Sequence, residues 1–156
     1  MSSGAAVSDA SPLIALFQVD RLDLLRNQFG QVFVPPAIEL EVAPSVGLLP
    51  SWVQRQPVSV PPDFLRHLDP GEREAIALAI HLGASFLVID DLPGRRAATS
   101  LGLRVIGSLG LLVRAKQRGL TNEVRPMMDE LVSRGLHVSE RVYREILFLA
   151  GETSAE

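Results

Sequence analysis

The chain has no cysteine, which excludes disulfides, thiolate metal sites and a cysteine nucleophile. It also has few aromatic residues, and Trp52 and Tyr143 are the single representatives of their types, so they read as packing residues rather than base-stacking platforms. Its three histidines show no HxxxH or HxH spacing, which argues against a zinc site. Any chemistry must therefore depend on oxygen and nitrogen ligands.

Lysine is almost absent as well, since fourteen arginines accompany a single lysine, and the formal net charge is −3. Such a chain has no generally basic surface, so contact with nucleic acid would need a local patch. No apolar run is long enough to cross a membrane, and the first residues lack the basic region of a secretion signal. We therefore expect a cytoplasmic protein that forms a single domain over residues 1–156.

Short apolar strands alternate with amphipathic helices along the chain. Strands that are apolar throughout are typical of a parallel sheet covered on both faces. The pattern thus predicts a three-layer α/β/α sandwich around a mostly parallel sheet of four or five strands, with helices added at the C-terminus. The expected strands are 5–9, 31–34, 58–60 at an edge, 85–89 and 104–107; the expected helices are 11–18, 21–29, 36–43, 69–83, 92–101, 108–119, 122–133 and 140–150, with one helical turn around 52.

Acidic residues come directly after two of the predicted strands or lie in the helices next to the strand ends. Asp9 follows the first strand, Asp90 and Asp91 follow the strand 85–89, and Glu41 and Glu72 lie in helices next to this edge. Ligands of parallel sheets bind at the carboxyl ends of the strands, and a cluster of carboxylates there is unfavourable unless a cation neutralises it. Mg²⁺ and Mn²⁺ prefer such oxygen ligands and can activate water, so the pattern indicates metal-assisted hydrolysis of nucleic acid.

Four segments resemble the PIN domain nucleases, and especially the small prokaryotic PIN-like proteins of the toxin–antitoxin type. The resemblance covers residues 5–118 and leaves 119–150 as a C-terminal helical extension. The segments are VSDASPLI (7–14), VPPAIELEV (34–42), LDPGEREAIALA (68–79) and FLVIDDLPGRRAATSLGLRVIGSLGLL (86–112).

This resemblance implies an Mg²⁺- or Mn²⁺-dependent endoribonuclease, a homodimer, and a small antitoxin protein as a partner. It places the metal-binding acids at Asp9, Glu41, Glu72 and either Asp90 or Asp91, with Glu39 and Glu74 as competitors of Glu41 and Glu72. The resemblance also implies that Ser11 forms a hydrogen bond to a ligand carboxylate or to a metal-bound water. It implies that Arg95 and Arg96 bind a phosphate group of the substrate.

Each acid also has a structural interpretation. Glu72 lies three residues after Asp69, the spacing of a capping box, and Asp9 and Asp91 can cap the helices that follow them. For Arg95 and Arg96 the sequence favours solvated helix-surface charges, with an ion pair between Arg96 and Asp91 or Asp90 as the alternative. A PIN-fold protein that binds nucleic acid or regulates a partner without cutting remains the alternative to an enzyme.

Overall fold

The computed structural model describes residues 4–153, and its centre is a parallel sheet of five strands in the order β3-β2-β1-β4-β5. Val7 of β1 pairs with Phe33 of β2 and with Leu87 of β4, which fixes the register at the middle of the sheet. The strands are β1 (Ala5–Ser8), β2 (Gln31–Val34), β3 (Val53–Arg55), β4 (Phe86–Val88) and β5 (Val105–Ile106).

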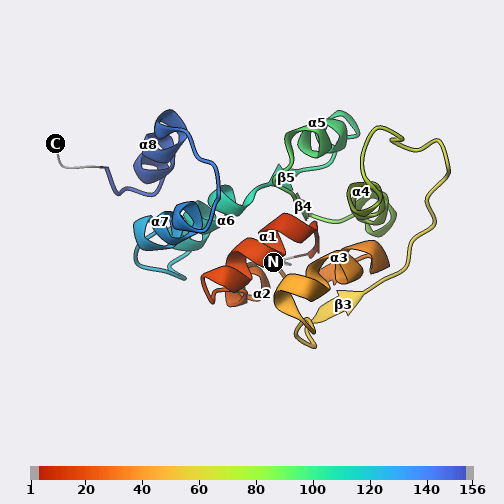
Figure 1. Ribbon diagram of the computed structural model, residues 1–156, viewed down its shortest axis with the longest axis horizontal. Coiled ribbons are helices and arrows are strands. Elements are labelled where there is room, and N and C mark those ends of the chain that lie inside the picture. Colours follow the sequence, from red (N-terminus) through yellow and green to blue (C-terminus); the bar gives the residue numbers. More distant parts are fainter. Residues whose placement is uncertain (1–3, 154–156) are drawn as a thin grey trace.

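Helices cover both faces of this sheet, so the predicted three-layer α/β/α sandwich is confirmed (Figure 1). One core joins the sheet to α1, α2, α3 and α6, and a second, smaller core joins it to α4 and α5. The helices are α1 (Ala10–Gln18), α2 (Asp23–Gln28), α3 (Pro36–Val46), α4 (Pro70–Leu82), α5 (Leu92–Ser100), α6 (Ser108–Gln117), α7 (Arg125–Ser133) and α8 (Glu140–Leu149).

The two C-terminal helices extend the larger core rather than standing apart from it. Met128 of α7 and Leu147 of α8 are buried in the same cluster as Leu112 of α6. In Figure 1, α7 and α8 lie beyond α6, away from the sheet. Residues 119–150 therefore pack on the core through α6.

The predicted edge strand at 58–60 is wrong. The strand at this edge of the sheet is β3, at Val53–Arg55. Pro57, Pro61 and Pro62 flank or follow the predicted segment, and proline cannot donate a ladder hydrogen bond. Trp52 lies in a turn before β3 rather than in a helical turn. The chain then crosses to α4 along the right-hand side of Figure 1 without regular strand or helix.

The helix ends follow the signals in the sequence closely. Asp69 caps α4 through a capping box with Glu72, and Gly83 closes this helix with φ of 60°, a left-handed conformation that suits glycine. Ser139 caps α8 by accepting a hydrogen bond from the backbone N–H of Val142. Within residues 4–153, no helix is both long and apolar enough to cross a bilayer.

Candidate functional site

The carboxyl ends of β1 and β4 and the first turns of the neighbouring helices bring several carboxylates to one edge of the sheet. Asp9 follows β1 directly, and its backbone N–H donates to the Val88 carbonyl of β4 over 2.8 Å. This bond anchors Asp9 between the two central strands. Only 5% of the residue is exposed to solvent.

The environment of Asp9 opposes its ionisation. Burial raises its pKa to about 7, and the negative charges of Glu41, Asp69 and Asp91 act in the same direction. A hydrogen bond from the Ala10 backbone only partly offsets these effects. Like charges within a few ångströms suppress one another's ionisation. The raised pKa of Asp9 is therefore in part an effect of these three neighbouring carboxylates.

Glu72 and Asp91 form a second feature of the site, because their side chains are hydrogen-bonded to each other. Two carboxyl groups can share a hydrogen bond only if one of them carries a proton. Burial, this hydrogen bond, and the charges of Asp69 and Asp91 raise the pKa of Glu72 to about 7. Asp91 also caps α5, since its Oδ2 accepts from the Gly94 N–H over 3.0 Å.

Glu41 reaches the site from α3 and lies against the first turn of α4. A Cβ added at Gly71 would lie 2.7 Å from Glu41 Oε1 and 3.6 Å from Asp69 Oδ1, so both carboxylates border this glycine. The residue as a whole is exposed, but its carboxylate lies over Gly71 and Ile38. Burial of that end and the charge of Asp69 raise the pKa of Glu41.

Asp69 is the acid that the sequence analysis assigned only a capping role. Its Oδ1 accepts from the Glu72 N–H over 2.8 Å, as the capping box requires, yet its charge raises the pKa of Asp9, Glu41 and Glu72. The signal in the sequence was its position one turn from Glu72, since both side chains extend from the first turn of one helix. Capping and membership of the carboxylate group thus coexist.

Asp90 has its hydrogen-bond partner at the start of α6. Its two carboxylate oxygens accept from the backbone N–H and the hydroxyl of Ser108, over 2.7 and 2.6 Å, which caps α6. Of the two neighbouring aspartates, Asp91 is therefore the one that lies with Asp9 and Glu72.

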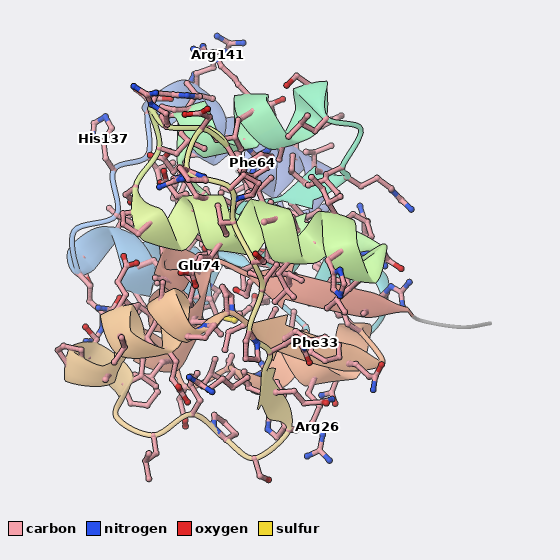
Figure 2. All side chains as sticks on the ribbon, turned by 90° about the vertical axis from the view of Figure 1, so that its right-hand side faces the viewer. Arg26, Phe33, Phe64, Glu74, His137 and Arg141 are labelled. Carbon is pink, nitrogen blue, oxygen red and sulfur yellow. The ribbon has the colours of Figure 1, made fainter. Side chains whose placement is uncertain are left out.

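The two competing glutamates also have other partners. Glu39 forms an ion pair with Arg55 of β3 at 2.9 Å, rather than standing alone in solvent. Glu74 accepts a hydrogen bond from the Ala37 N–H at the start of α3 over 3.1 Å, and Figure 2 shows it between α4 and α3. These contacts leave Glu41 and Glu72 as the glutamates of the carboxylate group.

The predicted phosphate and hydroxyl residues lie beside the site in different ways. Ser11 is exposed in the first turn of α1, and no hydrogen bond joins its hydroxyl to a carboxylate among the described residues. Arg95 donates to the Ile89 carbonyl over 3.0 Å and, like Asp90, borders Gly107. Arg96 is exposed on α5, and within residues 4–153 it forms no ion pair with either aspartate.

The chemistry of this donor set fits a hard divalent cation. Asp9, Glu41, Glu72 and Asp91 supply only carboxylate oxygens, and no ion pair in the described part of the chain neutralises any of them. Over residues 4–153, however, no three acidic or histidine side chains are gathered tightly enough to form a finished metal-binding group. The site therefore has the ligand type that such a cation prefers, without a gathered set of three ligands in the described residues.

A cleft of about 640 Å³ opens beside Asp90, between the start of α6 and the segment that joins α7 to α8. Asp90, Arg95 and Ser108 form its polar wall, and Leu136 and Val142 belong to its apolar wall. The C-terminal helices thus border Asp90 and Arg95 rather than the four carboxylates.

Comparisons with known proteins agree with this architecture. A family model described as a PIN domain matches residues 5–152, a range that includes α7 and α8. A solved structure, a PilT N-terminus domain protein from the hyperthermophilic archaeon Sulfolobus solfataricus P2, is 18% identical, with a TM-score of 0.50 over 87% of this chain and 98% of that one. No curated protein gives a significant match. The resemblance seen in the sequence is therefore confirmed, and the chain belongs to the PIN domain family, whose members are generally nucleases.

Proposed function

We propose that the protein is an endoribonuclease dependent on Mg²⁺ or Mn²⁺, in which Asp9, Glu41, Glu72 and Asp91 hold the cation. The observation that carries this proposal is Asp9, a nearly buried carboxylate surrounded by other acids. A protein keeps such a group at a cost in folding free energy unless something of positive charge binds there. The membership in a family of nucleases supports the reaction type.

The residues have distinct parts in this proposal. The backbone of Asp9 is anchored by the Val88 carbonyl, so its carboxylate would extend from a fixed point in the sheet, while Glu41 and Glu72 extend from helices. Glu72 shares a proton with Asp91 that must leave before both can bind a cation. When bound, the cation would supply an activated water and stabilise charge on the phosphodiester oxygens.

RNA as substrate, a homodimer, and a toxin role with a small antitoxin protein as inhibitor belong to the same proposal. The resemblance to the small prokaryotic PIN-like proteins supports them.

The decisive experiment is cleavage of labelled single-stranded and structured RNA with Mg²⁺, Mn²⁺ or EDTA. Wild-type protein should cut only with metal, and Asp9→Asn and Glu41→Gln should each lower the rate by at least about 10²-fold, because each removes a charged ligand of the cation. Glu39→Gln is the matched control, since Glu39 lies on the same helix but pairs with Arg55. It should retain wild-type activity.

A non-cutting PIN-fold protein is the second candidate, favoured by the absence of a gathered three-acid group within residues 4–153. It would bind nucleic acid or a protein partner and leave RNA intact in every metal. Calorimetry separates the two proposals. A protein that neither cuts RNA nor binds Mn²⁺ at Asp9 would overturn the nuclease.

A further inference from the structure

A cluster of positively charged arginine side chains lies at the amino ends of the strands, the edge of the sheet opposite to the carboxylates. Phe86 is the first residue of β4, Arg104 directly precedes β5, and Trp52 directly precedes β3. The last turn of α6 returns to this edge, because the helix starts at the opposite edge, where β5 ends. It brings Arg114 and Arg118 with it. We call this the amino-end surface; it consists of Arg26, Trp52, Phe86, Arg104, Arg114 and Arg118.

Aromatic rings hold these guanidinium groups in place. The Cζ of Arg104 lies 4.4 Å from the centre of the Phe86 ring, and the Cζ of Arg114 lies 4.9 Å from the same centre. Arg114 also lies 5.0 Å from the ring of Phe29, and Arg26 lies 6.0 Å from the ring of Trp52. A guanidinium stacked on a ring keeps its N–H groups directed outward at its edge, where they can bind an anion.

The positive charges of this surface lack acidic partners. Across residues 4–153, no ion pair joins Arg26, Arg104, Arg114 or Arg118 to a carboxylate. Arg114 instead donates to the neutral Gln28 side chain over 3.2 Å. Burial and the charges of Arg118 and Arg104 lower its pKa, which shows that the three cations lie within electrostatic reach.

The helix dipole explains only part of this arrangement. Cations at the end of α6 are favoured by its negative pole, which accounts for Arg114 and Arg118. It does not account for Arg104, which precedes β5, or for Arg26 on α2. In a chain of net charge −3, such a local excess of positive charge is unfavourable unless an anion binds.

A cleft of about 330 Å³ continues this surface toward β3. Arg26, Phe29 and Trp52 line it together with Gln31 and Gln54. Trp52 thus packs in part on the core, as the sequence predicted, and also lines the cleft. Phe29 lies between the cleft and Arg114, since it lines the cleft and its ring lies 5.0 Å from the Cζ of Arg114. Arg26 is labelled in the lower half of Figure 2.

We propose that the amino-end surface binds single-stranded nucleic acid, with its phosphates on Arg104, Arg114 and Arg118 and a base in the cleft beside Trp52. Arginines that follow a phosphate backbone, combined with aromatic rings, are the elements by which proteins bind single strands without reading sequence. An acidic peptide would use the charges but has no need of Trp52. The choice of RNA over DNA rests on the proposed nuclease function.

The test is fluorescence anisotropy of a short labelled single-stranded RNA, titrated with full-length protein in EDTA so that no cleavage occurs. Arg104→Gln with Arg118→Gln should weaken binding about tenfold, and the slope of log K against log salt should fall by about 1.4, since each lost phosphate contact in a single strand contributes about 0.7. Trp52→Leu should weaken binding about tenfold through lost stacking. Thermal melts check that each variant is folded.

The matched control is Arg134→Gln with Arg141→Gln, which removes the same charge from exposed positions on α8 and at the end of α7. It should bind RNA as wild type does. Equal weakening in both double variants, or no RNA binding by wild type, would overturn the proposal. Binding of polyglutamate in preference to RNA would also overturn it, in favour of an acidic protein partner.

Cleavage assays on the same proteins separate this surface from the nuclease. A wild type that binds RNA in EDTA through the amino-end surface but cuts nothing with Mn²⁺ would refute the nuclease alone. A double variant that retains full affinity while wild type cuts normally would refute the surface alone.

Discussion

Asp90 and Asp91 are neighbours in the chain with different surroundings. Asp90 is bound through both oxygens to Ser108 at the start of α6. Asp91 caps α5 and, through its hydrogen bond with Glu72, belongs to the carboxylate group. The two residues therefore stabilise different helices, and the proposed cation site uses Asp91.

Asparagine substitutions should separate these roles. Asp90→Asn removes a charge from the α6 N-terminus and one acceptor of Ser108, and we expect a loss of about 1–2 kcal/mol in the free energy of unfolding. RNA cleavage per folded molecule should persist. Asp91→Asn should change stability by less than about 1 kcal/mol, because asparagine also caps helices, and should abolish cleavage and Mn²⁺ binding. Urea unfolding and calorimetry measure both effects, and the opposite pattern would place Asp90 in the site.

At the scale of the element, the first turn of α4 lies directly against α3 at Gly71. Glycine permits this approach, since a Cβ there would lie 2.7 Å from Glu41 Oε1 and 2.9 Å from Ile38 Cδ1. Ile38 is fully buried, so of these two contacts the Glu41 side chain is the one that can move. The glycine thus sets the position of a carboxylate from another helix.

Gly71→Ala should therefore displace Glu41 and weaken Mn²⁺ binding about tenfold. The gain of about 1 kcal/mol from alanine in a helix should be offset by the close contact with Ile38, so the free energy of unfolding should fall by no more than about 1–2 kcal/mol. Gly110→Ala is the comparison. Gly110 lies in the first turn of α6, and a Cβ there would lie 3.2 Å from Ile106 Cγ1 with no carboxylate in contact. Unchanged Mn²⁺ affinity in Gly71→Ala would show that Glu41 is not a ligand.

Glu152 joins the C-terminal elements. It accepts from the Val124 and Arg125 N–H groups at the start of α7, over 2.6 and 3.0 Å, and from the Lys116 ammonium of α6 over 2.9 Å. Burial by itself would raise the pKa of Glu152, but these three donors together lower it. The carboxylate form is therefore preferred in the folded protein.

Glu152→Gln should lower the free energy of unfolding by about 2 kcal/mol at pH 7, because it weakens charge-assisted hydrogen bonds that are largely shielded from water. A lowered pKa contributes stability above the pKa of the unfolded chain, and this contribution disappears as pH falls through the folded pKa. The difference between wild type and variant in urea unfolding should therefore shrink below about pH 4. A difference that does not depend on pH would contradict this account.

At the scale of the whole molecule, the carboxylate edge makes stability depend on pH and metal. The pKa values of Asp9 and Glu72 are raised to about 7 in the folded protein, so the folded state holds protons that the unfolded chain has already released. In EDTA, stability should therefore fall as pH rises from the unfolded pKa, near 4, to about 7. A bound cation would reverse this loss, because it favours the ionised carboxylates.

Melting curves test this expectation. In EDTA the Tm should be several °C higher at pH 5 than at pH 8, since each kcal/mol shifts Tm by about 2–4 °C in a domain of this size. Mn²⁺ should raise the Tm at pH 8 and have little effect at pH 5. Asp9→Asn should flatten the pH dependence and remove the response to Mn²⁺. The same pH dependence in Asp9→Asn as in wild type would show that this residue is not its source.

Local signals in the sequence were sufficient for most of the fold. Caps such as Asp69 and Ser139 and apolar strands such as 31–34 act over a few residues, so the chain determined these elements without reference to distant partners. The edge strand was misplaced because apolar residues at 58–60 outweighed the surrounding prolines in the prediction. The strand that pairs with β2 is instead β3, the segment Val53–Arg55, which contains no proline and lies just before Pro57.

Local patterns along the chain were enough to predict that acids gather at one edge of a parallel sheet, since strand ends converge in any such fold. Which of these acids lie together depends on contacts between elements that are far apart in the chain. Asp90 accepts a hydrogen bond from Ser108, which lies 18 residues further along the chain. Glu74 accepts one from Ala37 at the start of α3. Spacing alone cannot show such contacts, because side-chain direction at a strand or helix end depends on the donors that distant elements bring to it.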